Sequence, residues 1–234
     1  MPLPKIEQPL FDLTIPSTGK NVKFRPFTVK EEKILLIAQE SNDIKQIVNS
    51  IKQIVGNCVY DVDVDKLAMF DLEYILINLR AKSVNNEIEF KIKDPDTEEE
   101  IELSLDINDI EVKISDDHSK VIKLSDDIHI MMKYPQIDQL IDLQKSEKEN
   151  QSEALFEIMM GCIDSVVQGE EVYSLKDFTK AEVDEFLESL SSHHVESIKN
   201  FFDTMPILRY EKKYKREDGT EKTFVAEGTE TFFI

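Results

Sequence analysis

Residues 11–38 read FDLTIPSTGKNVKFRPFTVKEEKILLIA, and this stretch decides how the fold begins. Apolar and polar residues alternate over residues 11–15 and again over residues 22–24, which is the period-two pattern of half-buried strands. The PSTG sequence at residues 16–19 supplies residues that favour a turn. We therefore predict a β-hairpin that is ended by Pro26, because proline has no N–H with which to continue a ladder.

A helix is predicted to begin after Thr28. Thr28 and Glu31 have the spacing of a capping box, in which the two residues satisfy backbone N–H groups that a first helical turn leaves free. The apolar run Ile34–Ala38 is expected to form the buried face of this helix.

Two further helices are predicted before residue 85. Apolar residues follow the i, i+3, i+4, i+7 rule over residues 43–58, with Asp43 in position to cap the first turn. The next helix is expected to run from about Asp65 to Lys82. Together with the hairpin, these helices are predicted to form an N-terminal hairpin plus three-helix unit over residues 1–84.

Residues 85–133 change to the period of strands. Apolar residues alternate with charged ones on both sides of DPDT at residues 94–97, which is a turn sequence. Further short strands are expected at Glu111–Ile114, Val121–Leu124 and Ile128–Met132. We therefore predict a central acidic antiparallel β-meander, whose charged outer face would discourage edge-to-edge pairing.

Residues 134–234 are predicted to form a C-terminal helical unit with a terminal hairpin. Helices are expected at residues 137–141, 154–167, 179–190 and 195–205. A polar loop is predicted at residues 144–152, Gly169 is a candidate helix stop, and EDG at residues 217–219 favours a hairpin turn. Because helical and strand blocks are segregated, the predicted fold class is α+β, in one compact protein.

The composition is strongly acidic. The chain has 234 residues and a formal net charge of −20 at pH 7, and half of that charge lies in residues 85–117, where thirteen acidic residues accompany three lysines. Such a surface repels nucleic acid and anionic membranes, so neither is expected as a partner, although the charge also has the simpler role of keeping the protein soluble. Residues 1–10 contain no signal-peptide core, and we expect synthesis in the cytoplasm.

The residue types that bind metal ions do not have the required spacing. Asp61, Asp63 and Asp65 resemble the opening of a calcium loop, but Lys66 occupies the position that needs glycine and Leu72 the position that needs glutamate. We therefore expect no metal ion, and Asp65 is interpreted as a helix cap.

No catalytic or cofactor-binding motif is found in the sequence. Cys58 and Cys162 both lie in apolar patterns and are interpreted as small buried hydrophobic residues without a disulfide. His193 and His194 are adjacent, so on a helix they point about 100° apart and do not suit one metal ion. The glycine-rich phosphate-binding motifs are also absent from the sequence, and we predict no cofactor and no enzymatic activity.

Two C-terminal features allow more than one interpretation. The basic residues of the last hairpin, Arg209, Lys212, Lys213, Lys215 and Arg216, are interpreted as a solvated face, with RNA binding or a protein-binding edge as alternatives. The apolar tail Phe232-Phe233-Ile234 is expected to leave water, either by docking on the protein's own core or by inserting into a groove of a partner.

Several strings of the sequence, taken together in their order, resemble a known family. They are PSTG at residues 16–19, FRPF at 24–27, KEEK at 30–33, the segment 62–84, and MKYP at 132–135. In this order they resemble the baseplate hub assembly proteins of T-even-like contractile-tailed bacteriophages, over nearly the full chain. These strings indicate ancestry and are not chemical signatures.

The resemblance implies a role in virion morphogenesis, with other phage baseplate hub or tail proteins as partners. Such a protein either stays in the hub as a structural component or leaves as an assembly chaperone, so it is expected in the host cytoplasm during assembly and, if retained, in the virion baseplate. Some relatives carry paired cysteines at the tip of the second hairpin, where this chain has residues 94–97, so turn residues and hydrogen bonds are expected to replace that staple. The sequence assigns no oligomeric state.

The partner-binding residues that we predict come from both ends of the chain: Arg25, Phe27, Phe232, Phe233 and Ile234. The Arg25 guanidinium follows a strand between Phe24 and Phe27, so it could hold a partner's carboxylate with two hydrogen bonds. The alternative, which we favour, is an internal ion pair that fixes the hairpin to the first helix.

Three functions are weighed. The leading one is a non-enzymatic hub assembly protein that acts by protein–protein contact. The second is a cytosolic acidic adaptor or inhibitor whose meander mimics a nucleic-acid surface. The third is a small hydrolase with a site that is assembled only in space.

Overall fold

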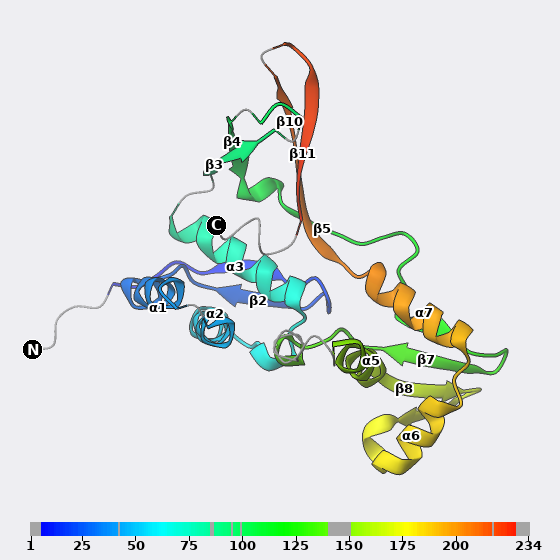
Figure 1. Ribbon diagram of the computed structural model, residues 1–234. Coiled ribbons are helices and arrows are strands. Elements are labelled where there is room, and N and C mark those ends of the chain that lie inside the picture. Colours follow the sequence, from blue (N-terminus) through cyan, green and yellow to red (C-terminus); the bar gives the residue numbers. More distant parts are fainter. Residues whose placement is uncertain are drawn as a thin grey trace, which may run out of the picture. The chain divides into compact units, whose positions relative to one another are not determined.

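The computed structural model describes residues 6–41, 43–84, 87–94, 96–98, 100–139, 151–216 and 218–227. The chain divides into two compact units, one formed by the residues up to 113 together with those from 207 on, and the other by residues 114–206. We call them the terminal unit and the inserted unit. Helices and small antiparallel sheets make up both units, so the α+β class is confirmed (Figure 1).

The described part of the terminal unit contains three sheets and three long helices. Its elements are β1 (Phe11–Thr14), β2 (Asn21–Phe24), α1 (Val29–Gln39), α2 (Ile44–Cys58), η1 (Val64–Lys66), α3 (Met69–Ser83), β3 (Glu87–Lys93), β4 (Glu100–Asp106), η2 (Ile107–Asp109), β5 (Glu111–Lys113), β10 (Ile207–Lys215) and β11 (Glu221–Glu227). The strands pair as β1-β2, as β3-β4 and as β11-β10-β5.

The predicted N-terminal hairpin is confirmed. β1 and β2 pair antiparallel, with Phe11 opposite Phe24. Gly19 closes the turn with a φ of +68°, a conformation that glycine adopts without a steric penalty. Beyond Phe24 the chain changes partner, because the Arg25 N–H donates to the Cys58 carbonyl at 3.0 Å. The hairpin is therefore tied to the end of α2.

The helices of this unit begin largely where capping residues predict. Asp43 caps α2 by accepting a hydrogen bond from the Lys45 N–H at 2.9 Å. The third helix begins at Met69 and not at Asp65, because residues 64–66 form the separate turn η1 and Asp71 accepts the Ala68 N–H at 3.1 Å. Most residues of α3 are buried, so this helix forms the centre of the terminal unit (Figure 1).

Strands occur in residues 85–133 as predicted, but they do not form one continuous meander. β3 pairs only with β4, whereas β5 pairs with β10 from the far end of the chain. Leu208 lies opposite Val112 in that register and is completely buried. β10 therefore supplies the partner strand of β5. No local sequence pattern shows this pairing, because the two strands come from distant parts of the chain.

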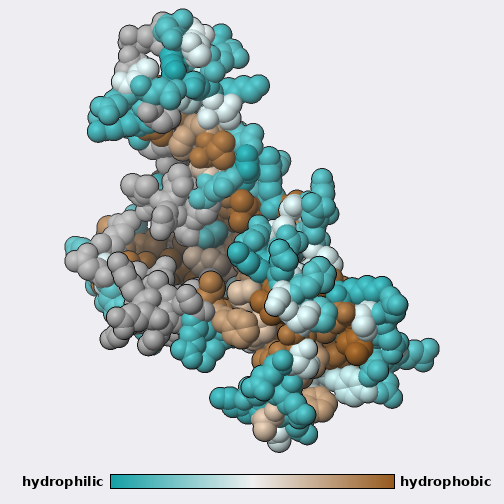
Figure 2. All heavy atoms as spheres, turned by 45° about the vertical axis from the view of Figure 1, so that its right-hand side comes forward, coloured by the Kyte–Doolittle hydropathy of each residue, from teal (hydrophilic) through white to brown (hydrophobic). Residues whose placement is uncertain are grey.

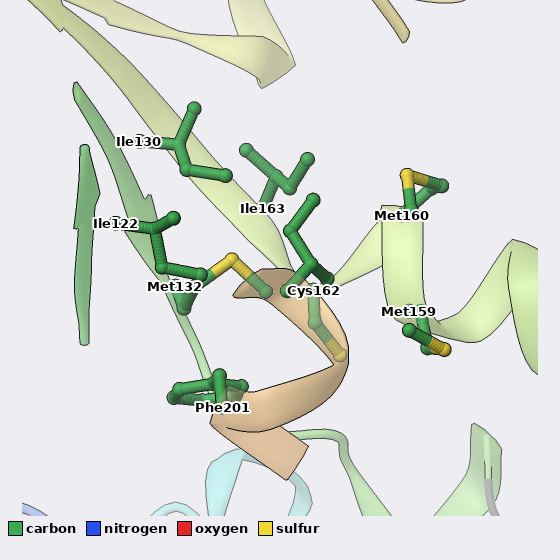
Figure 3. Packing of buried hydrophobic residues seen from close by; sticks show 9 residues of the cluster. Ile122, Ile130, Met132, Met159, Met160, Cys162, Ile163 and Phe201 are labelled. Atoms are coloured by element: carbon green, nitrogen blue, oxygen red, sulfur yellow. The ribbon is translucent and has the colours of Figure 1, made fainter. Parts of the chain in front are cut away.

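Within the described residues, the inserted unit contains one sheet and three helices of nine residues or more. Its elements are β6 (Val121–Lys123), β7 (Ile128–Met132), α5 (Gln151–Gly161), β8 (Ile163–Gln168), β9 (Glu171–Ser174), η3 (Leu175–Asp177), α6 (Lys180–Glu188) and α7 (Ser192–Asp203). The strand order is β6-β7-β8-β9. Its core joins sheet, α5 and α7 residues, including Ile130, Met132, Cys162, Ile163 and Phe201 (Figure 3).

The helix predicted over residues 154–167 is wrong in its second half. α5 ends at Gly161, and Ile163–Gln168 is the strand β8, which pairs with β7 and β9. The β-branched Val166 and Val167 fit a strand better than a helix. Gly169 consequently forms the hairpin turn after β8, with a φ of +59°, and does not stop a helix.

The predicted loop at residues 144–152 lies mostly outside the described residues. Gln151 and Ser152 belong to α5, so the loop prediction is wrong at its end. Within the described residues, no helix combines the length and the apolar composition that crossing a bilayer would require.

Candidate protein-contact surfaces

Arg25 forms an internal ion pair. Of the two interpretations of this residue, this was the one we favoured. Its Nη1 and Nη2 atoms donate to Glu31 Oε2 and Oε1 at 3.3 and 3.1 Å. The Glu31 carboxylate also accepts the Thr28 N–H at 3.0 Å, so the predicted link between Thr28 and Glu31 is present. The ion pair fixes the start of α1 to the strand β2.

The Glu31 carboxylate is fully buried. Burial by itself would raise its pKa, but the hydrogen bonds from Arg25 and Thr28 and the charge of Arg25 outweigh burial and lower the pKa to about 2. The pair therefore favours folding above the ordinary carboxyl pKa, and this contribution is lost as the pH falls from about 4.5 to about 2.

Replacing Glu31 with glutamine is expected to lower the free energy of unfolding at pH 7 by about 1–3 kcal/mol, after allowance for solvent screening at Arg25. The variant should also lose less stability than the wild type on acidification below pH 4.5. Urea unfolding at several pH values measures both effects. Glu32→Gln, on the exposed side of α1, is the matched control, and an equal loss in that variant would contradict the role of the buried pair.

Phe27 links α1 to the end of α3 through its backbone. Its side chain is half-buried, and its N–H donates to Ser83 Oγ at 2.7 Å. Of the predicted partner-binding residues, Arg25 and Phe27 thus lie together at the base of α1. Phe232, Phe233 and Ile234 lie outside the described residues.

The outer face of α1 carries exposed apolar side chains. Val29, Leu36 and Ile37 are 80%, 58% and 49% exposed, and we call these three residues the α1 stripe. Their spacing of seven and eight residues places them on one face of the helix. The prediction that Ile34–Ala38 is the buried face is therefore wrong for Leu36 and Ile37, whereas Ala38 is buried.

A groove of about 690 Å³ lies between α5 and α6 of the inserted unit, and we call it the α6 groove. Its apolar lining consists of Phe156, Met160, Ile163, Leu175, Val183 and Leu187. None of the residues of α6 is buried, and a second apolar pocket of about 340 Å³ opens beside Val183 and Phe186. The space-filling view shows hydrophobic surface exposed between hydrophilic residues (Figure 2).

A buried carboxylate joins the tips of two hairpins in the terminal unit. Asp94 follows β3, and its side chain is inaccessible to solvent. Arg216, which follows β10, donates from Nε to Asp94 Oδ2 at 2.7 Å, and Tyr214 donates its hydroxyl to the same oxygen at 2.8 Å. Asp96 extends the network by pairing with Arg216 and with Lys222. We call these five residues the hairpin clasp.

At residues 94–97, turn residues and hydrogen bonds were expected in place of the paired cysteines of some relatives. The hairpin clasp lies at this position. Asp94 Oδ1 accepts the N–H groups of Asp96 and Thr97 at 2.9 and 3.2 Å, which forms the turn. The hydrogen bond from Arg216 is the main reason why the pKa of Asp94 lies well below its usual range. The sequence interpretation missed Arg216, which it assigned to a solvated basic face.

The two cysteines, and two of the aspartates that resembled a calcium loop, are buried or ion-paired. No group of three or more histidine, cysteine or acidic residues is placed to hold a metal ion in the described parts of the chain. Cys58 and Cys162 are free and buried, and burial raises both pKa values to about 11, so each is protonated at neutral pH. Asp63 and Asp65 pair with Lys66 and Lys52.

Exposed apolar side chains therefore lie on α1 of the terminal unit and line the α6 groove of the inserted unit. The chain matches the family model described as T4 bacteriophage base plate protein over residues 8–234, and it belongs to that family. No curated protein and no solved structure gives a match. Family membership indicates a structural protein of the phage baseplate that contacts other baseplate proteins.

Proposed function

We propose that this chain is an assembly protein of the central baseplate hub and acts by protein–protein contact in the host cytoplasm during assembly. The observation that carries the proposal is the α1 stripe. Three large apolar side chains on one helix face are the pattern by which a helix docks in a groove. The stripe begins directly after FRPF at residues 24–27 and spans the segment where the resemblance to hub assembly proteins is strongest.

Recovery of the tagged chain during phage infection tests this proposal. The chain is pulled down with its partners at an early and at a late stage, and finished particles are analysed separately. We expect hub proteins in the early sample. Presence of the chain in finished particles would identify a retained component, and its absence would identify a chaperone that leaves. Recovery without any tail protein at either stage would refute the proposal.

Deletion of Phe232–Ile234 is expected to weaken the capture of hub proteins several-fold and to leave the melting temperature unchanged within about 1 °C. The reason is that an apolar tail inserted into a partner contributes to binding without contributing to the chain's own core. Pull-down and thermal unfolding of the same preparation measure the two effects.

The control for this deletion is Thr229→Ala combined with Thr231→Ala, which keeps the apolar residues. A loss of melting temperature that accompanies the loss of capture would instead assign the tail to the protein's own core.

A further inference from the structure

The helix α7 is fastened to the rest of the inserted unit by a histidine ring at each end. His194 lies in its first turn, and His118 contacts Thr204, which follows its last residue. Between these two points, α7 buries Ile198 and Phe201 in the core of the unit. The hydrogen bonds of the two rings show which charge state each contact needs.

The His194 ring must be neutral to make both of its hydrogen bonds. Its Nδ1 atom accepts the Ser191 N–H at 3.2 Å, as in a capping box at the start of a helix. Its Nε2 atom lies 3.1 Å from the Leu124 carbonyl, which follows β6. A carbonyl oxygen only accepts, so Nε2 carries the ring hydrogen. A proton added at Nδ1 would set two donors against each other.

The contacts of His118 also suit a neutral ring. The Thr204 hydroxyl donates to the Asn200 carbonyl at 2.7 Å, so its oxygen accepts a hydrogen bond from His118 Nδ1 at 3.0 Å. A neutral ring has one N–H, and Nε2 therefore accepts the Tyr134 hydroxyl at 2.9 Å. A second ring proton would force the hydrogen of the Tyr134 hydroxyl to turn away from Nε2.

Neither ring forms an ion pair with a carboxylate within the described residues. The charged residues on the segments around His118 are Asp116, Asp117, Lys120, Lys133 and Asp203. The charged and titratable residues on the segments around His194 are Lys123, Asp126, Asp127, Glu188, His193 and Glu196. Lys120 lies 4.3 Å from the centre of the Tyr134 ring, so a charged His118 would add a second cation to this cluster.

We propose that His118 and His194 form a clamp that holds α7 on the sheet of the inserted unit while both rings are neutral, and that protonation of the rings in acid releases the helix. We call these two residues the α7 clamp. Release uncovers Ile198 and Phe201, which α7 otherwise buries. The proposal does not depend on the proposed function.

The terminal unit provides an internal reference for this response. All four histidines of the chain lie within residues 114–206, so the terminal unit contains none. Its buried carboxylates Glu31 and Asp94 have lowered pKa values and stay charged until the pH falls much further. Mild acid therefore acts on the inserted unit and leaves the terminal unit closed.

The direction of the pH dependence follows from His118. Burial and the charge of Lys120 lower the pKa of His118 below its ordinary value of 6.5. The unfolded chain therefore takes up this proton at higher pH than the folded chain does. The stabilisation by the neutral ring is complete above the ordinary pKa and is lost as the pH falls through the lowered one.

Hydrogen–deuterium exchange of the purified full chain at about pH 7.5 and about pH 5.5 tests the α7 clamp. Because exchange itself slows in acid, peptides from α7 are compared with peptides from α3 in the same sample. Relative to α3, we expect α7 to lose roughly ten-fold in protection at the lower pH. An unchanged ratio in the wild type would overturn the proposal.

His118→Gln with His194→Gln tests whether these two rings cause the response. Glutamine keeps one donor and one acceptor without titrating, and it suits the capping-box position that His194 occupies after Ser191. This double variant should keep α7 protected at both pH values. Loss of protection in acid equal to that of the wild type would refute the clamp.

His129→Gln with His193→Gln is the matched control, because neither of these rings forms a hydrogen bond within the described residues. The control should lose α7 protection in acid as the wild type does, and a control that stays protected would assign the response to the wrong pair of histidines for this proposal. Circular dichroism at neutral pH shows whether each variant is folded. If the clamp variant does not fold, the wild type and the control still decide the outcome.

Discussion

Replacement of Phe201 by alanine is expected to lower the free energy of unfolding by roughly 3–5 kcal/mol. Phe201 is 2% exposed and lies in the core of the inserted unit (Figure 3). Its ring lies 5.6 Å from that of Tyr134, 5.1 Å from that of His118 and 5.1 Å from that of Phe202. Truncation therefore removes the contacts of three rings and leaves a cavity that rigid neighbours cannot fill.

Urea unfolding followed by far-UV circular dichroism measures this loss, because the chain contains no tryptophan to serve as a fluorescent probe. Phe178→Ala is the matched control, since Phe178 is 41% exposed. We expect that control to cost less than about 1 kcal/mol. Equal losses in the two variants would show that Phe201 is not a core residue.

Replacement of Arg216 by glutamine is expected to lower the melting temperature by roughly 5–10 °C at pH 7. The substitution removes the cation of the hairpin clasp and leaves the inaccessible Asp94 carboxylate without its main partner. Lys215→Gln is the neighbouring control, because Lys215 forms an exposed ion pair with Glu221 at 3.4 Å. A similar fall in that control would mean that surface charge, and not the clasp, determines stability.

A double variant separates two effects on stability: the penalty of an unpaired buried charge and the net contribution of the ion pair. Asp94→Asn in the Arg216→Gln background should recover part of the lost melting temperature, because no unpaired carboxylate remains. In the wild type, the low pKa of Asp94 means that the clasp favours folding at pH values above about 3.8 and loses this effect as the pH falls further. The Arg216→Gln variant should therefore show a shallower loss of stability in acid.

The sequence predicted those elements whose signals are local. The start of α1 after Thr28, of α2 after Asp43 and of α6 after Thr179 are confirmed. Each start depends on a side chain and a backbone group only two or three residues apart. The N-terminal hairpin was predictable for the same reason, because its alternation and its turn lie within residues 11–24.

The buried face of α1 was not predictable from its pattern. Ile34–Ala38 is a run of consecutive apolar residues, so no spacing distinguishes the inner from the outer face. The prediction of the α5–β8 boundary failed for a related reason. Residues 154–167 fit a helical spacing, but pairing of β8 with β7 and β9 overrides that local preference.

The hairpin clasp depends on a contact that a single sequence does not reveal. Asp94 and Arg216 lie 122 positions apart, and each belongs to a charged stretch in which it does not stand out. The turn at residues 94–97 was predicted from its composition, but its cation was not. The α6 groove is likewise formed by segments whose individual patterns show only amphipathic helices.

The pairing of β5 with β10 has a consequence for the order in which the two units fold during synthesis. Lys113 and Ile207 are direct partners in that pair, and all of residues 114–206 lie between them in the sequence. A ribosome therefore releases the whole inserted unit before β10 and β11 appear, so the inserted unit can fold while the terminal unit still lacks two strands. A chain truncated after Pro206 would contain all residues of the inserted unit and a terminal unit that lacks β10 and β11.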